Sequence, residues 1–300
     1  MIPVELNQRK TQMDALGTSL LIGFSALLGL NQALVKLVND GFAPIFQSGL
    51  RSLCAFFPVL LFALFMQRKL SVRDGSLPYG VLNGLFFCLE FGLLFQALDY
   101  TTVARASLFF YIMPVWVAIA AHFLLPDEPL HRNKVMGLAL AIGGVTIAFA
   151  GDLGDAGPDA WLGDILALVA GMCWAAIALL TRIKLARSSS EMNLLYQLAV
   201  LSIVMLSIAP LFGETIRQPN ALILSVFTFQ VLFVVAAGFL LWFWILSVYP
   251  VSNMASFGLL APLFGVLSGW LIFDDPLTLH FILAIGLAAG GILLVNRRPA

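Results

Sequence analysis

Long apolar runs separated by short polar connections make up nearly the whole chain. A helix needs about 20 apolar residues to cross a hydrocarbon core of roughly 30 Å, and ten runs approach or reach that length. They cover residues 16–38, 44–67, 76–98, 103–125, 134–151, 161–182, 192–212, 222–247, 252–273 and 278–296. No connection is long enough to form a soluble domain. The pattern therefore predicts an all-α polytopic membrane protein of ten transmembrane helices.

The composition agrees with this prediction and excludes other classes of protein. Of the 300 residues, 61% are hydrophobic and 11% are charged, against about 25% charged residues in an ordinary soluble domain. A soluble chain needs polar side chains that face water, and a disordered chain is polar throughout. Nucleic-acid binding requires a net basic face, whereas the formal net charge here is zero. The expected partners are a lipid bilayer and a small-molecule substrate, with no nucleic acid, and we expect a monomer.

The two halves of the chain resemble each other. Residues 103–127 align with residues 251–275 at a constant offset of 148, so that Pro114 falls on Pro262. An acidic-Pro-Leu turn and a Gly-Gly pair recur downstream in both halves. We divide the chain into a first repeat of five spans (1–150), a linker (151–160) and a second repeat (161–300). Because five is an odd number, the second repeat enters the membrane inverted, an architecture common among secondary transporters.

Charge is distributed unevenly between the two sides of the predicted bundle. Twelve of the 16 Lys and Arg residues fall on the side that holds both termini, and two fall on the opposite side. Acidic residues are divided the other way, six against nine. Since Lys and Arg concentrate on the cytoplasmic side of membrane proteins, both termini are predicted to be cytoplasmic. The net charge of zero is thus a cancellation between a basic face and an acidic face.

A few polar residues fall inside the predicted spans, where ionisable groups are expensive and mark functional sites. Glu90 and Arg51 lie at similar depths. Either they pair and only fasten two helices, or Glu90 faces a water-filled cavity and meets a substrate ammonium or carries a proton. Tyr79, Asn83 and Glu90 share one helical face, which either lines a transport path or packs between helices. Lys36 lies near a span end, where snorkelling explains it.

Two prolines and two aromatic residues complete the candidate chemistry. Pro114 and Pro262 fall in mid-span, where a proline frees the carbonyl four residues back, here those of Phe110 and Gly258. The two prolines form either a pair of hinges or passive kinks. Tyr111 and Trp174 offer aromatic walls for a cavity. The sequence contains no phosphate-binding loop and no metal-ligand spacing of histidines, so we expect no metal and no cofactor.

Several stretches resemble the EamA family of the drug/metabolite transporter superfamily. They are residues 28–36, residues 95–107 leading to Pro114, residues 128–145 and residues 163–175. The resemblance covers nearly the whole chain and implies ten helices around a central cavity between two repeats. Lys36, Pro44, Arg51 and Pro114 match the family pattern, whereas Tyr79, Asn83 and Glu90 have no assigned place in it. Within the superfamily, the sequence is most similar to the YddG-type exporters of aromatic amino acids.

We therefore predict a secondary transporter of the bacterial inner membrane that exports amino acids, aromatic ones favoured, and related small metabolites by alternating access. The alternatives are export of another amphipathic metabolite or a drug by the same fold and, less favoured, an intramembrane enzyme or receptor. The predicted cavity residues are Tyr79, Asn83, Glu90, Tyr111 and Trp174, the predicted hinges are Pro114 and Pro262, and the basic residues shared with the family are Lys36 and Arg51.

Overall fold

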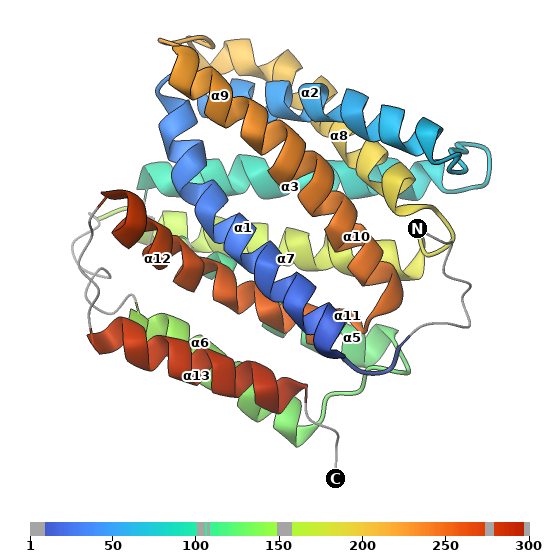
Figure 1. The fold of residues 1–300 in the computed structure, drawn as a ribbon, viewed down its shortest axis with the longest axis vertical. Coiled ribbons are helices and arrows are strands. Elements are labelled where there is room, and N and C mark those ends of the chain that lie inside the picture. The colour runs from blue at the N-terminus through green and yellow to red at the C-terminus, as the bar shows by residue number, and fades with distance from the viewer. Residues whose placement is uncertain (1–9, 101–105, 107–108, 149–157, 274–278, 297–300) are drawn as a thin grey trace.

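The computed structural model describes residues 10–100, 106, 109–148, 158–273 and 279–296. The side chains of some residues within helices, Lys36 among them, and most of the predicted linker lie outside the described residues. Apart from an isolated β-bridge between Phe42 and Ile216, the described secondary structure is helical (Figure 1). The α-helices are α1 (Ala15–Asn39), α2 (Pro44–Phe65), α3 (Leu77–Tyr100), α5 (Met113–Leu124), α6 (Arg132–Ala148), α7 (Ala160–Ile183), α8 (Ser190–Ile208), α9 (Ala221–Phe229), α10 (Phe239–Val248), α11 (Val251–Ser256), α12 (Ala261–Phe273) and α13 (Leu279–Val295).

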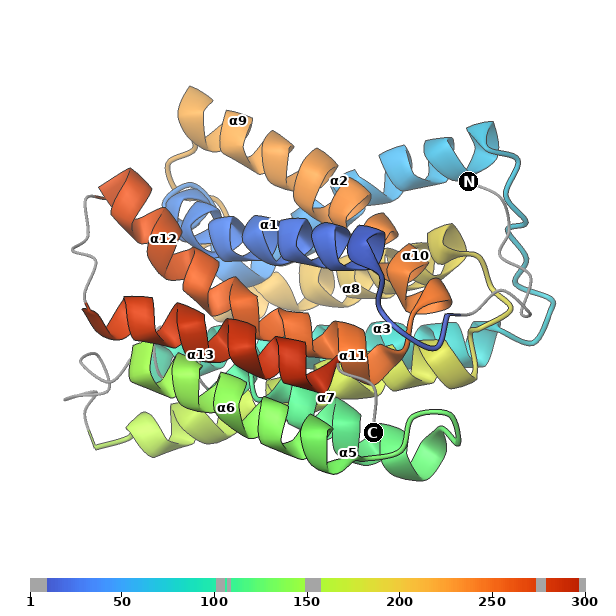
Figure 2. The ribbon, with the colours of Figure 1, turned by 60° about the horizontal axis from the view of Figure 1, so that its bottom comes forward.

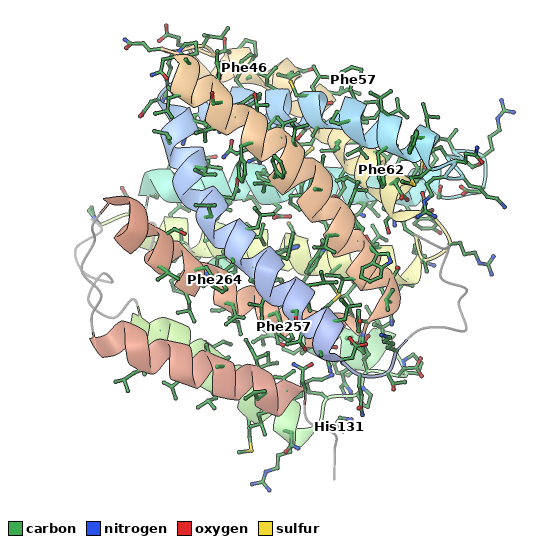
Figure 3. All side chains as sticks on the ribbon, viewed as in Figure 1. Phe46, Phe57, Phe62, His131, Phe257 and Phe264 are labelled. Carbon is green, nitrogen blue, oxygen red and sulfur yellow. The ribbon has the colours of Figure 1, made fainter. Side chains whose placement is uncertain are left out.

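Some helices begin at capping groups that the sequence supplies, and the helices lie within or close to the predicted spans. Asp14 caps α1 by accepting from the Gly17 N–H, Ser189 caps α8, and Pro44 opens α2. Among the described residues, five helical stretches are long and apolar enough to cross a membrane: Pro44–Phe65, Leu77–Leu94, Ala160–Ile183, Ser190–Phe212 and Ala221–Val248. Large apolar side chains such as Phe57 and Phe62 point outward from α2 (Figure 3). The prediction of an all-α polytopic membrane protein is confirmed.

Corresponding helices of the two halves run in opposite directions. Arg68, just after α2, donates to Glu191 at the start of α8 (3.0 Å), while Gly49 near the start of α2 lies against Leu206 near the end of α8. Figure 2 shows α6 beside α13. A Cβ placed on Gly137 of α6 would come within 2.5 Å of the Gly291 carbonyl oxygen of α13. These helices touch backbone to backbone, which small residues permit.

Other helix contacts also join one half to the other. α3 packs against α7 and α8, α1 against α9, α10 and α12, and α5 against α7. Phe257 and Phe264 lie beside α1 in Figure 3, where the Ser25 hydroxyl donates to the Phe257 carbonyl (2.8 Å). The main hydrophobic core therefore draws its residues from both halves and lies between them.

Both mid-span prolines begin a helix and do not kink a continuous one. A turn at Tyr111 and Ile112 precedes α5, and a 3₁₀ segment (Phe257–Leu260) precedes α12. Pro114 and Pro262 each lie in the first turn of the helix that follows, where a proline costs no helical hydrogen bond. The prediction that Gly258 has a free carbonyl is wrong, because that carbonyl accepts from the Ala261 N–H in 3₁₀ geometry.

Basic side chains gather at one end of the bundle, which we call the basic end. Arg68, Arg132, Lys134, Arg182 and Lys184 lie in the loops and helix ends there. Lys10 pairs with Asp14 at the same end, and the Tyr249 hydroxyl donates to Asp14 (2.7 Å). The hydrogen bonds from Lys10, the Gly17 N–H and Tyr249 hold the pKa of Asp14 well below its ordinary value. This contact fastens the start of α1 to the end of α10.

Candidate substrate path between the two halves

The interface of α3 with α7 contains two layers of polar side chains. Asn83 Nδ2 of α3 donates to Thr181 Oγ1 of α7 (2.9 Å), and Cys173 of α7 lies near the Glu90 carboxyl group of α3. The two helices are therefore antiparallel, which brings Glu90 level with Cys173 and Trp174. Seven residues separate the Asn83 layer from the Glu90 layer along α3, or about 10 Å of helix.

Glu90 and Arg51 are both buried, with 7% and 5% of their surfaces exposed. In the part of the chain that the structure describes, no ion pair joins them. Glu90 Oε2 and Arg51 Nε have no hydrogen-bond partner, and the Arg51 guanidinium lies 5.5 Å from the centre of the Phe91 ring. Within the described residues, Glu90 and Arg51 therefore do not form the ion pair that would fasten α3 to α2. A buried charge without a partner costs several kcal/mol, so these two side chains are candidates to bind groups of opposite charge.

Aromatic rings form a continuous row across the interface. Each ring of this row contacts the next at a centroid distance of 4.8–6.3 Å, in stacked, tilted or edge-on geometry. The aromatic row consists of Tyr111, Phe110, Trp174, Trp242, Phe24, Phe239, Phe87 and Phe91. Its members come from both halves, and Glu90 is adjacent to Phe91 on α3. A flat apolar ring is the shape that such a surface accommodates.

A polar cluster lies on the side of this row that is farther from the basic end. Gln230 donates to Asn31 Oδ1 of α1 (3.2 Å) and accepts from Gln47 Nε2 of α2 (3.5 Å). Gln230 opens a π-helical segment, Gln230–Gly238, between α9 and α10. Insertions of π-helix are frequent at functional sites. Arg51 lies one turn after Gln47, and we call Asn31, Gln47, Arg51 and Gln230 the outer polar cluster.

A second polar cluster lies on the side of the row nearer the basic end. It consists of Asn83, Thr181, Asn193 and Gln197, all at most 5% exposed. A small pocket of about 20 Å³ between α7, α8 and α10 is lined by Thr181 and Asn193, with Arg182, Phe243 and several serines. Asn83 Oδ1, Asn193 Oδ1 and both polar atoms of the Gln197 amide lack hydrogen-bond partners. We call this set the inner polar cluster.

Glu128 joins the two halves at the basic end. This carboxylate, in the loop between α5 and α6, accepts from the Val251 and Ser252 N–H groups (both 2.8 Å) and from the Ser252 hydroxyl. Arg182 Nη2 lies 3.9 Å from Glu128 Oε1. A loop of the first half thus holds the start of α11 in the second half.

The structure brings some of the predicted cavity residues together and leaves others apart. Tyr111 and Trp174 belong to the aromatic row, Glu90 lies beside it, and Asn83 lies in the inner polar cluster. Tyr79 is 37% exposed at the start of α3, with the Lys184 ammonium 5.4 Å from its ring centre, so it lies at the basic end. The side chain of Lys36 lies outside the described residues.

Sequence reasoning missed several residues of these clusters. Gln47 and Arg51 on α2 correspond to Asn193 and Gln197 on α8 at an offset of 146. The same pattern, two polar residues four positions apart, occurs near the start of the second span of each repeat. This pattern could have indicated the two clusters. Trp242, which was not among the residues predicted to line the cavity, is 4% exposed and central to the aromatic row.

Metal chemistry receives no support from the described residues, among which no three His, Cys, Asp or Glu side chains gather. Cys54, Cys88 and Cys173 are free thiols. The candidate path contains amides, hydroxyls, aromatic rings and two ionisable groups of opposite sign. Such groups can hold a small amphipathic molecule by hydrogen bonds, ring contacts and charge.

Comparisons with known proteins identify the class of protein that this fold defines. A crystal structure 19% identical in sequence shares the fold, with a TM-score of 0.79 over 92% of this chain and 96% of that one. The uncharacterized transporter YoaV of Bacillus subtilis is 22% identical over 280 residues, which cover 91% of this chain and 94% of that protein. This similarity and the family match described next make the molecule a multi-pass membrane transporter and not an enzyme.

The particular family follows from a match to both repeats. The profile of the EamA-like transporter family matches residues 15–150 and again residues 161–297. The chain therefore belongs to the EamA-like transporter family and contains two EamA repeats. A protein of Escherichia coli named "probable amino-acid metabolite efflux pump" is 26% identical over 279 residues, covering 87% of this chain and 89% of that protein. Its Salmonella typhimurium counterpart of the same name is 27% identical over 274 residues.

Proposed function

We propose that this transporter exports amino acids, aromatic ones favoured, across the bacterial inner membrane by alternating access. The observation that carries the proposal is that two buried ionisable side chains of opposite sign, Glu90 and Arg51, form no ion pair with each other in the described structure and lie on neighbouring helices beside a row of aromatic rings. The names of the Escherichia coli and Salmonella typhimurium relatives point to the same substrate class. An α-amino acid carries one positive and one negative group, so a single molecule supplies the missing partner of each charge.

Substrate binding follows from the chemistry of these groups. The Glu90 carboxylate takes the substrate ammonium, and the Arg51 guanidinium takes the carboxylate as a bidentate partner. The substrate ring inserts among Trp174, Trp242 and Tyr111, where ring contacts contribute about 0.5–1.5 kcal/mol each beyond apolar burial. Binding removes the cost of two unpaired buried charges at once, which favours a zwitterion over an apolar molecule of the same size.

Transport requires that the path open at one end and close at the other. We propose ten spans in two inverted repeats with both termini in the cytoplasm. The antiparallel course of α2 and α8 and the concentration of Lys and Arg at the basic end support this topology. The helix breaks before Pro114 and Pro262 are the hinges. At the basic end, the contacts of Glu128 with Val251 and Ser252 close the path and break when that end opens.

Efflux of radiolabelled phenylalanine from proteoliposomes tests the proposal, with protein-free vesicles as the control. The wild-type protein is expected to accelerate efflux, and Trp174→Ala and Glu90→Gln to reduce it. Competition by unlabelled alanine, phenylalanine and an amphipathic drug compares amino acids with other substrates of the same fold. Absence of flux for every amino acid tested would refute amino-acid export and leave the family assignment intact.

A further inference from the structure

The inner polar cluster contains hydrogen-bonding capacity that the protein does not use. Gln197 is 1% exposed, and neither its Oε1 nor its Nε2 has a partner. Asn83 donates from Nδ2 to Thr181, and its Oδ1 has no partner. Asn193 Oδ1 also has no partner. Buried amides are nearly always satisfied in folded proteins, so such groups call for an explanation. Polar groups that face the interior of a membrane bundle either hydrogen-bond between helices or line the route of a substrate.

The position of Gln197 links the pocket at the basic end to the aromatic row. One turn toward the basic end, Asn193 lines the pocket together with Thr181. One turn in the other direction, Leu201 packs with Phe87, a member of the aromatic row, and Ile177. Gln197 therefore lies between the small pocket at the basic end and the proposed ring-binding surface, on the face of α8 that points into the molecule.

The two polar clusters differ in chemistry although they occupy equivalent places in the two repeats. Gln47 and Arg51 of the outer cluster correspond to Asn193 and Gln197 of the inner one. The outer cluster contains a cation and a connected chain of amides from Gln47 through Gln230 to Asn31. The inner cluster is uncharged and leaves four amide atoms unpaired, against Gln47 Oε1 and Arg51 Nε in the outer cluster. An uncharged set of amides and a hydroxyl offers donors and acceptors together, which suits a zwitterionic head group without attracting either ion alone.

We propose that the inner polar cluster is a second substrate-binding site, at which the ammonium and carboxylate of the amino acid are hydrogen-bonded as it enters from the basic end. Gln197 is the specificity-determining residue of this site: its Nε2 donates to the substrate carboxylate, and its Oε1 and Asn83 Oδ1 accept from the ammonium. The substrate then advances about 10 Å to the layer of Glu90 and Trp174. This inference rests on the proposed function and adds to it the loading step.

Gln197→Met tests the site, because methionine has nearly the same length and no amide. In oriented proteoliposomes, the KM for phenylalanine supplied at the basic end is expected to rise about tenfold, equivalent to about 1.4 kcal/mol. The KM for phenylalanine supplied at the opposite end is expected to stay at the wild-type value. The thermal unfolding midpoint is expected to stay equal or rise, because an apolar side chain replaces an unpaired amide. Gln197→Leu is the second variant if Gln197→Met does not fold.

Ser202→Ala is the matched control on α8, since the Ser202 hydroxyl already bonds to the Ala199 carbonyl of its own helix (3.0 Å). This variant is expected to keep the wild-type KM from both ends. A wild-type KM at the basic end in Gln197→Met would overturn the second site, and so would a fall in thermal stability without a change in KM. If the wild-type protein itself moves no amino acid, the proposed function fails first, which separates that failure from a failure of the second site alone.

Discussion

Removal of the Glu128 carboxylate is expected to favour the conformation in which the basic end of the transporter is open. In Glu128→Ala, the N–H groups of Val251 and Ser252 lose their acceptor, and Arg182 loses a negative neighbour at 3.9 Å. Glu128 is 5% exposed, so water does not replace these contacts while the end stays closed. Loss of one partner of a buried charged network costs about 3–5 kcal/mol. The closed arrangement therefore loses at least about a hundredfold in population relative to one open at this end.

Thiol labelling measures this shift. Ser256, 0% exposed and one turn deeper than Ser252 on α11, is changed to cysteine in a background that lacks the native thiols, which are Cys54, Cys88 and Cys173. A membrane-impermeant maleimide is expected to label Ser256→Cys much faster when Glu128→Ala is also present. Asp127→Asn, an exposed neighbouring carboxylate, is the control and is expected to leave the labelling rate unchanged. Equal labelling with and without Glu128 would refute the role of this carboxylate in closing the basic end.

Three further predictions follow from particular contacts. Glu90→Gln keeps the shape of the side chain and removes its charge, so phenylalanine flux is expected to fall at least tenfold while expression and thermal stability are retained; unchanged flux would exclude an ion pair with substrate. Gly137→Leu is expected to destabilise the α6–α13 contact by several kcal/mol, because a Cβ at position 137 would meet a carbonyl oxygen at 2.5 Å. A wild-type melting temperature in this variant would contradict the prediction. Because the pKa of Asp14 is lower in the folded state, the Asp14 carboxylate is expected to stabilise the fold above about pH 4. This stabilisation is lost as the pH falls through the folded-state pKa. The difference in melting temperature between wild type and Asp14→Asn should therefore shrink toward low pH, and a difference that stays constant would contradict this prediction.

Much of the architecture was readable in the sequence because membrane insertion leaves strong signals. Apolar runs predicted the helices, and a shared proline register predicted corresponding breaks in the two halves. The state of those breaks was not predicted: a 3₁₀ turn satisfies the Gly258 carbonyl, and the Phe257 carbonyl receives the Ser25 hydroxyl. A proline indicates where a helix is interrupted. The helix packed against that break determines which backbone carbonyl accepts a hydrogen bond.

The candidate site was predicted less completely than the fold. Glu90, Asn83, Tyr111 and Trp174 were visible as polar or aromatic residues at membrane depth, but Trp242 and Gln197 were not singled out. Arg51 and Glu90 match in depth along their helices and still form no ion pair in the described structure. Depth follows from sequence position, whereas the rotation of a helix about its axis depends on the neighbours against which it packs.

By itself, the sequence determined that this chain spans the membrane many times, that it contains two related halves, and that its charges are unequally divided between two faces. The tertiary structure decided which face of each helix points inward. In a bilayer, lipid-facing and core-facing side chains are both apolar, so hydrophobicity does not distinguish them. The aromatic row, the unpaired charges of Glu90 and Arg51 and the incompletely bonded amide of Gln197 came to light only when antiparallel helices from the two halves were placed against each other.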